Sequence, residues 1–198
     1  MEPCGKNFIK ELEDILSRRE RRPIENPGYV RAAVIVPLFN KDGNCHLLFT
    51  RRTQEVKHHK GQISFPGGAF DDEDGDLRQT ALRETFEEIG LNEKDVRIIG
   101  ILDDIVTSTN FVVTPFVGYF SYPHPFRLSR REIDELIEVP LSVLLDPASF
   151  SEREIIDGDL KRLVYNYQCG PHSIWGATAL IVRQFLPLVS SLERTSQV

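Results

Sequence analysis

Residues 31–39, RAAVIVPLF, form an almost uninterrupted apolar run, and the turn sequence KDGN (41–44) follows them. An apolar run of this length between turn signals is typical of a buried strand. CHLLFT (45–50) comes directly after the turn, so the two segments predict a β-hairpin. The chain is therefore expected to build its fold on a sheet.

Strand-like and helix-like segments alternate along the rest of the chain. Helices are expected over residues 6–19, 77–89 and 174–189, and further strands at 63–65, 97–107, 112–120, 132–138 and 161–167. This order predicts an α/β (α+β) domain with a mixed central sheet. The expected organisation is an N-terminal helix with a Pro-rich connector at 1–28, a domain at 29–190 and a tail at 191–198.

Composition narrows the class of protein. The chain has 198 residues, of which 40% are hydrophobic and 27% charged, as in one ordinary globular domain. A net charge of −6 argues against broad binding of nucleic acid. No stretch reaches the roughly 18 apolar residues of a membrane span, and the N-terminus lacks a signal-peptide pattern. The expected partner is thus a small molecule, with no nucleic acid and no membrane, and a homodimer is left open.

The three cysteines, Cys4, Cys45 and Cys169, are far apart, odd in number and without a CxxC pair. This spacing predicts neither a disulfide framework nor a zinc site, and it favours a reducing cytoplasm.

The stretch RETFEEIGL (83–91) carries three glutamates within five positions. On a helix Glu84, Glu87 and Glu88 share one face, because they are i, i+3 and i+4 neighbours. The opposite face is expected to hold Leu82, Phe86 and Ile89, and Gly90 fits a helix end. One interpretation is a solvated acidic face. Like charges at this spacing repel, however, so the alternative is a cation over the face, and oxygen ligands suit Mg²⁺ or Mn²⁺.

Together with the glycines before the helix, this stretch resembles the Nudix box, written G-x5-E-x7-R-E-U-x-E-E-x-G-U with U a bulky aliphatic residue. The matching positions are Gly68, Arg83, Glu84, Glu87, Glu88, Gly90 and Leu91. Three features depart from the pattern: Asp74 replaces the first Glu, eight residues instead of seven separate it from Arg83, and Thr85 replaces the aliphatic residue. The resemblance implies a Nudix-like α/β/α sandwich with a mixed central sheet.

Residues 47–68, LLFTRRTQEVKHHKGQISFPGG, resemble the upstream motif of one Nudix branch, the coenzyme A diphosphatases. Lys57 stands where that motif has Arg, and Thr50 lies one place late. TALRE (80–84), EVPLSVLLDP (138–147) and IWGATA (174–179) are also similar to that branch.

The resemblance implies a metal-dependent diphosphatase. The substrate would be coenzyme A or acyl-CoA, cleaved to 4′-phosphopantetheine (or its acyl form) and adenosine 3′,5′-bisphosphate. Alternatives are another nucleoside diphosphate derivative (ADP-ribose, a dinucleotide or an oxidised nucleotide) and a Nudix-fold binding module without turnover.

The resemblance also implies roles for the box residues. Glu84, Glu87, Glu88 and the Gly68 carbonyl would hold Mg²⁺ or Mn²⁺. Glu84 would orient or deprotonate the attacking water, and Arg83 would pair with a glutamate.

Three further expectations concern a later carboxylate, the substrate-binding residues and Trp175. A later carboxylate is expected in the site, and Glu135 is favoured over Glu132, with a solvated turn as the alternative. The expected substrate-binding residues are Arg51, Arg52, Lys57 and His59 of the basic segment, with Gly67 and Gly68; the basic segment could instead be a solvated charge run. Trp175 is expected to pack in the core.

Overall fold

The structure, a computed structural model, describes residues 4–54, 60–157 and 160–195. Its helices are α1 (Lys6–Arg18), α2 (Leu77–Ile89), α3 (Leu141–Leu145) and α4 (Gly176–Thr195), with short 3-10 helices η1 (Glu93–Asp95) and η2 (Pro147–Ser149). Its strands are β1 (Val30–Lys41), β2 (Asn44–Arg52), β3 (Ile63–Ser64), β4 (Gly67–Ala69), β5 (Val96–Ile101), β6 (Ile105–Val106), β7 (Phe111–Phe120), β8 (Ile133–Pro140), β9 (Phe150–Asp157), β10 (Leu160–Cys169) and β11 (His172–Trp175).

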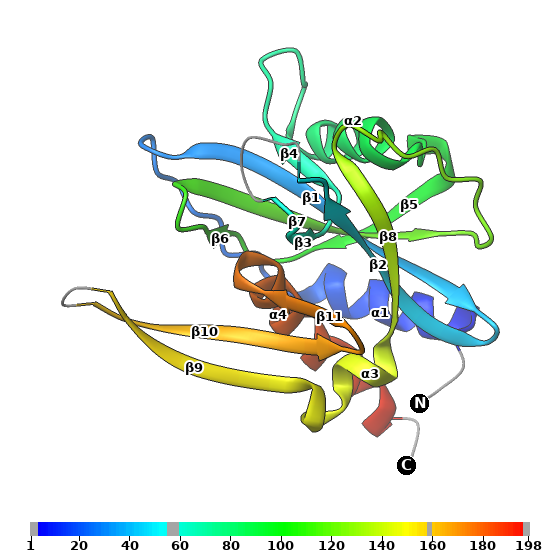
Figure 1. The fold of residues 1–198 in the computed structure, drawn as a ribbon. Coiled ribbons are helices and arrows are strands. Elements are labelled where there is room, and N and C mark those ends of the chain that lie inside the picture. Colours follow the sequence, from blue (N-terminus) through cyan, green and yellow to red (C-terminus); the bar gives the residue numbers. More distant parts are fainter. Residues whose placement is uncertain (1–3, 55–59, 158–159, 196–198) are drawn as a thin grey trace.

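A mixed sheet with the order β3-β2-β1-β7-β5 forms the middle layer (Figure 1). β4 pairs with β1, β6 with β7 and β8 with β2. β1 and β7 run parallel from the pair Val30 and Phe111 to the pair Leu38 and Tyr119, whereas β1 and β2 form the predicted antiparallel hairpin. Helix α2 lies on one side of this sheet and helices α1 and α4 lie on the other (Figure 1). The predicted α/β/α sandwich with a mixed sheet is confirmed.

The apolar run of β1 is explained by its position between these layers. Successive side chains of a strand point to opposite faces. Ile35 and Phe39 pack into the cluster under α2, and Val36 and Leu38 pack into the cluster that includes α1 and α4. All four side chains are fully buried, so a polar residue at any of these positions would lose its contact with water.

Helix α1 belongs to the larger of the two hydrophobic clusters. Phe8, Leu12 and Leu16 are buried there. The helix lies so close to β5 that a Cβ on Gly100 would be 2.5 Å from the Cβ of Leu16. The buried face of α1 is thus part of the core.

The predicted strand at 97–107 is divided into β5 and β6 because the residues between them bind the connector after α1. Asp103 forms an ion pair with Arg19 at 2.8 Å, and the buried Asp104 forms one with Arg21 at 2.8 Å. Asp104 also accepts a hydrogen bond from the backbone N–H of Ile24 at 2.9 Å. These contacts fix the connector to the edge of the sheet.

A second sheet has the order β11-β10-β9 and extends away from the body (Figure 1). The sequence predicted only part of β10 and missed β9. The C-terminal helix begins at Gly176 and not at Ile174, because His172–Trp175 pairs with β10 as β11. Trp175 lies on this edge strand with 47% of its surface exposed, so the prediction that it packs in the core is wrong.

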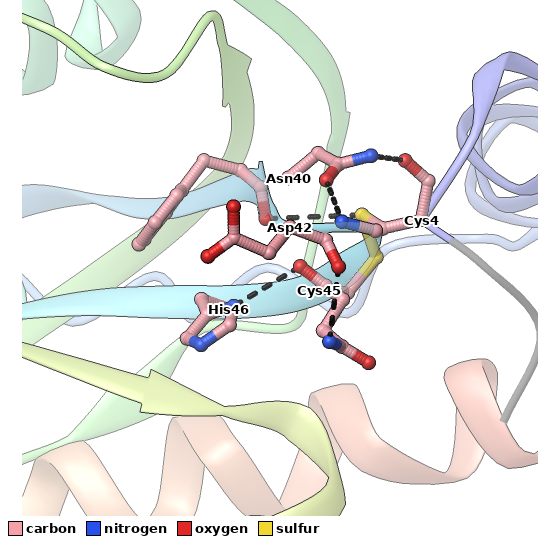
Figure 2. The surroundings of a disulfide bond; sticks show 8 residues. Cys4, Asn40, Asp42, Cys45 and His46 are labelled. Atoms are coloured by element: carbon pink, nitrogen blue, oxygen red, sulfur yellow. Dashed lines mark hydrogen bonds between the residues drawn. A yellow bond between two sulfur atoms is a disulfide. The ribbon is translucent and has the colours of Figure 1, made fainter.

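Cys4 and Cys45 form a disulfide with a Cα to Cα distance of 4.8 Å (Figure 2). The prediction of unpaired cysteines is therefore wrong for this pair. Backbone contacts bring the two residues together: Cys4 donates its N–H to the Gly43 carbonyl at 2.8 Å and accepts a hydrogen bond from the Asn40 side chain. The expectation of a reducing compartment, which rested on unpaired cysteines, loses that support.

Cys169 is free and buried, and burial raises the pKa of its thiol to about 11. None of the helices in the described ranges combines the length and apolar character of a membrane span.

Candidate active site

Local signals fix both ends of α2. Asp76 caps the N-terminus, because its side chain accepts a hydrogen bond from the backbone N–H of Gln79 at 2.8 Å. Gly90 ends the helix in the left-handed conformation, φ +74°, and donates its N–H to the Phe86 carbonyl at 2.8 Å. The predicted helix over residues 77–89 is confirmed.

The buried face of α2 is rotated from the predicted one. Leu82 and Ile89 are buried as expected, but Phe86 is 50% exposed. Thr85 and Glu88 are buried in its place. The face centred on these two residues lies against β1 and β4, so a carboxylate occupies a position that apolar periodicity assigned to solvent.

Glu88 is the most buried of the three glutamates, with 3% of its surface exposed. Its carboxylate accepts a hydrogen bond from the backbone N–H of Gly67 at 3.2 Å and pairs with Arg52 at 3.3 Å. Burial raises the pKa of Glu88 to about 8, although Arg52 and the Gly67 N–H act in the opposite direction. β4 therefore holds this carboxylate through its backbone.

Glu84 lies directly over Gly68. A Cβ at residue 68 would be 2.6 Å from the Oε1 atom of Glu84, so only glycine leaves room for the carboxylate in this position. Burial raises the pKa of Glu84, and Arg83 opposes that rise. The first box glycine and the first catalytic candidate are thus placed by the same close contact.

Arg83 joins three carboxylates. Its guanidinium contacts Asp74 at 2.8 Å, Glu84 at 2.8 Å and Glu87 at 3.3 Å. The expected pairing of Arg83 with a box glutamate is confirmed. The hydrogen bond from Arg83 holds the pKa of Asp74 well below its usual range, and Thr80 donates a further hydrogen bond to Asp74 at 2.8 Å.

Two departures from the box pattern are explained by this contact. Asp74 has one methylene fewer than the expected Glu, and one extra residue lies between it and Arg83. The altered loop still delivers the carboxylate to the guanidinium. From the sequence, Asp74 was only a departure from the Nudix box pattern, and no role was predicted for it.

The acidic residues around β8 separate into two environments. Glu135 pairs with Arg51 at 3.0 Å, and Asp134 pairs with the same guanidinium at 2.7 Å. Burial is the main cause of the raised pKa values of Glu84 and Glu88. The negative charge of Glu132 raises both pKa values further. The charge of Glu132, an exposed residue, thus acts on two of the box glutamates. Its place in the turn before β8, where strand alternation does not constrain it, is the sequence signal that could have favoured it.

The basic segment is described only in part. Arg51 is held by carboxylates of β8, and Arg52 is held by Glu88. Lys60 is exposed, whereas Lys57, His58 and His59 lie outside the described residues.

The donors around Glu88 fit a hard divalent cation. They are the carboxylate oxygens of Glu84, Glu87 and Glu88 on α2, and Mg²⁺ and Mn²⁺ prefer oxygen ligands. In the described ranges, no three acidic, His or Cys side chains converge to enclose an ion. Arg52 pairs with Glu88, and Arg83 pairs with Glu84. Arg52 is an incomplete partner, since its Nε is buried without an acceptor in the described part of the chain. A divalent ion held by Glu84, Glu87 and Glu88 would offset the charge of these carboxylates, of which Glu88 is buried.

Comparison with known proteins agrees with this geometry. The sequence profile of the NUDIX domain matches residues 28–157. A protein named uncharacterized Nudix hydrolase NudL, from Escherichia coli (strain SMS-3-5 / SECEC), is 34% identical over 178 residues, which cover 87% of this chain and 92% of that protein. The chain belongs to the Nudix family.

One further relative and one solved structure are also similar to this chain. The NudL protein of Shigella boydii serotype 18 is also 34% identical, over 87% of this chain and 92% of its own length. The crystal structure of a MutT/nudix family protein from Enterococcus faecalis superposes with a TM-score of 0.52 at 16% identity and covers 93% of this chain and 73% of that one. At this identity the second match supports the fold alone.

Proposed function

We propose that this Nudix protein hydrolyses the diphosphate of coenzyme A or an acyl-CoA with Mg²⁺ or Mn²⁺. The products are 4′-phosphopantetheine, or its acyl form, and adenosine 3′,5′-bisphosphate. The observation that carries the hydrolytic part is the position of Glu84, whose carboxylate lies over Gly68 beside the buried Glu88. The resemblance of residues 47–68 to the coenzyme A diphosphatase motif supports the choice of substrate.

The reaction adds the oxygen of water to one phosphorus of the diphosphate and breaks the bond from that phosphorus to the bridging oxygen. A divalent cation held by Glu84, Glu87, Glu88 and the Gly68 carbonyl would neutralise diphosphate charge and activate the water. Glu84 orients the water or accepts its proton, since burial raises the pKa of this carboxyl. Arg83 acts as a positioning residue. Its guanidinium is anchored by Asp74 and directly contacts Glu84 and Glu87.

We assign the further carboxylate of the site to Glu132, whose charge acts on both Glu84 and Glu88. Glu135, which the sequence favoured, serves as a matched control because its carboxylate pairs with Arg51. Glu132→Gln should lower kcat by on the order of tenfold, the range of a lost outer partner of a metal site, because its charge no longer acts on Glu84 and Glu88. Glu135→Gln should stay within about twofold of wild type, as for a surface substitution. The reverse order would return the role to Glu135.

Lys57, His59 and the arginines Arg51 and Arg52 remain proposed contacts for the phosphates of the substrate. The two arginines would then exchange a carboxylate of the protein for a phosphate oxygen, which suits the bidentate geometry of guanidinium.

The deciding experiment is a product assay by mass spectrometry. The protein is incubated with Mg²⁺ or Mn²⁺ and, in parallel, with coenzyme A, ADP-ribose, NADH and a nucleoside triphosphate. Metal-dependent release of 4′-phosphopantetheine, with little turnover of the others, is expected. Heavy-oxygen water would label the product whose phosphorus is attacked.

Preferred turnover of another substrate would keep the Nudix reaction and overturn the assignment to coenzyme A. Absence of turnover on every substrate would favour a binding module without catalysis.

A further inference from the structure

A cavity of about 450 Å³ opens beside the candidate active site, between the C-terminal end of α2, helix η1 and the segment that joins β7 to β8. This volume is within the range of small-molecule sites. Its lining includes Phe86, Glu87, Asn92, Asp95, His124 and Arg127. The function proposed above uses only Glu87 of these residues.

Backbone contacts hold the walls of the cavity together. Arg127 donates its N–H to the Ile89 carbonyl at 2.9 Å, and Ser129 donates to the Glu88 carbonyl at 2.9 Å. Gly90 allows the close approach, because a Cβ there would lie 3.0 Å from the Arg127 backbone nitrogen. The His124 ring lies against Phe126 with a centroid distance of 4.9 Å. These contacts tie the segment that joins β7 to β8 to the end of α2.

Two side chains of the cavity are left without a partner in the described ranges. Phe86 is half exposed on the helix surface, and its ring is in none of the aromatic pairs of the described residues. The guanidinium of Arg127 forms no ion pair or hydrogen bond with the described residues, whereas Arg51, Arg52 and Arg83 are all paired with carboxylates. A phenyl face and an uncommitted guanidinium in one cavity suit a planar base that carries a phosphate.

Glu87 connects this cavity to the candidate metal site, because it lines the cavity and contacts Arg83 in the box. A substrate whose diphosphate lies at Glu84, Glu87 and Glu88 can therefore extend one end past Phe86. We propose that the cavity binds the nucleoside end of the substrate, with the base against Phe86 and a ribose phosphate at Arg127. This proposal rests on the proposed function and deepens it, since coenzyme A carries such a 3′-phosphate.

The test measures binding directly and needs no turnover. Isothermal titration compares adenosine 3′,5′-bisphosphate with adenosine 5′-monophosphate on the full chain. Arg127→Ala should weaken the bisphosphate by roughly tenfold, as expected for a lost charge-assisted hydrogen bond, and change the monophosphate by about twofold or less. Phe86→Ala should weaken both ligands by roughly tenfold through lost stacking, and Phe86→Tyr should restore them.

Lys94→Ala is the matched control. Lys94 is an exposed residue of η1 that does not line the cavity, and its loss changes the net charge as Arg127→Ala does. It should change neither ligand by more than about twofold. Unfolding temperatures are compared for all variants, so a misfolded protein is not mistaken for a lost contact.

The outcomes separate this inference from the proposed function. Wild type that binds neither ligand, or an Arg127→Ala variant that weakens both equally, would overturn the subsite. A Lys57→Ala variant that alone raises KM for coenzyme A over 3′-dephospho-coenzyme A would assign the 3′-phosphate to the basic segment and refute the role of Arg127. Selective binding without hydrolysis of coenzyme A would refute the proposed reaction and leave the subsite standing.

Discussion

Gly68→Ala would place one methyl group where the carboxylate of Glu84 lies. The added Cβ would be 2.6 Å from the Oε1 atom of Glu84, far inside van der Waals contact, so the carboxylate must move by about 1 Å. A misplacement of this size costs on the order of 100-fold in rate, or about 2.7 kcal/mol in kcat/KM. The pair with Arg83 would also be weakened, but both side chains are partly exposed, and such a pair contributes about 1 kcal/mol or less.

Gly67→Ala provides the control for this prediction. Gly67 has φ +149°, and a Cβ there would lie 2.6 Å from the Cα of Val34 in β1. Backbone atoms of a central strand cannot move aside as the end of a glutamate can. Gly67→Ala should therefore lower the free energy of unfolding by at least about 2 kcal/mol, whereas Gly68→Ala should change it by less than about 1 kcal/mol.

The assay combines urea unfolding with initial rates of metal-dependent hydrolysis on the substrate that the product assay identifies. A Gly68→Ala protein with activity within about twofold of wild type would show that the position of Glu84 does not matter. Equal destabilisation by the two substitutions would show that Gly68 is required for folding and not for the site.

Three other perturbations test separate parts of the structure. Asp74→Asn should destabilise the protein by roughly 2–4 kcal/mol near neutral pH, because it removes a buried partner of Arg83. Since the pKa of Asp74 is lowered on folding from its ordinary 3.8, its contribution is present above that pKa and is lost as pH falls below it; urea unfolding at several pH values should therefore show a steeper acid loss in wild type than in the variant. Glu88→Gln should keep or raise the melting temperature in chelator, because a neutral amide costs less to bury than a carboxylate, and should abolish the rise that Mn²⁺ causes in wild type; a rise in the variant would remove Glu88 from the metal site. Replacement of both Cys4 and Cys45 by Ser should lower the free energy of unfolding by roughly 2–4 kcal/mol, because the bond closes a long loop, and should leave kcat unchanged, since the bond lies at the start of β2 and the site at its end; a change in kcat alone would contradict this reasoning.

Local chemistry made α2 predictable from the sequence. Asp76 and Gly90 mark its ends through contacts within four residues, and the box spacing aligned Glu84 and Glu87 without knowledge of the fold. Glu88 behaves differently, because its partners Gly67 and Arg52 are 21 and 36 residues away. Helical periodicity predicted that Glu88 is exposed, because its burial depends on contacts with residues far away in the sequence.

The other errors have the same origin. The disulfide joins cysteines 41 residues apart, and only the contact between the segment before α1 and the β1–β2 turn brings them together. Trp175 was expected in the core because it and the aromatic residues around it sit at helical or strand spacing. It instead pairs with Asn166 on the edge of the second sheet and is 47% exposed. Residues 102–104 interrupt a strand-like run because the side chains of Asp103 and Asp104 pair with arginines of the connector.

The tight contact between α1 and Gly100 bears on where the domain of this protein begins. The match to the NUDIX domain profile begins at residue 28, yet Phe8, Leu12 and Leu16 fill the same apolar interior as the strands that follow. A protein truncated at residue 28 would lack α1. Apolar residues of β5 and α4 that α1 covers would then be exposed to water. Exchange of this unit between relatives, by recombination or by cloning, would have to carry the first helix with it.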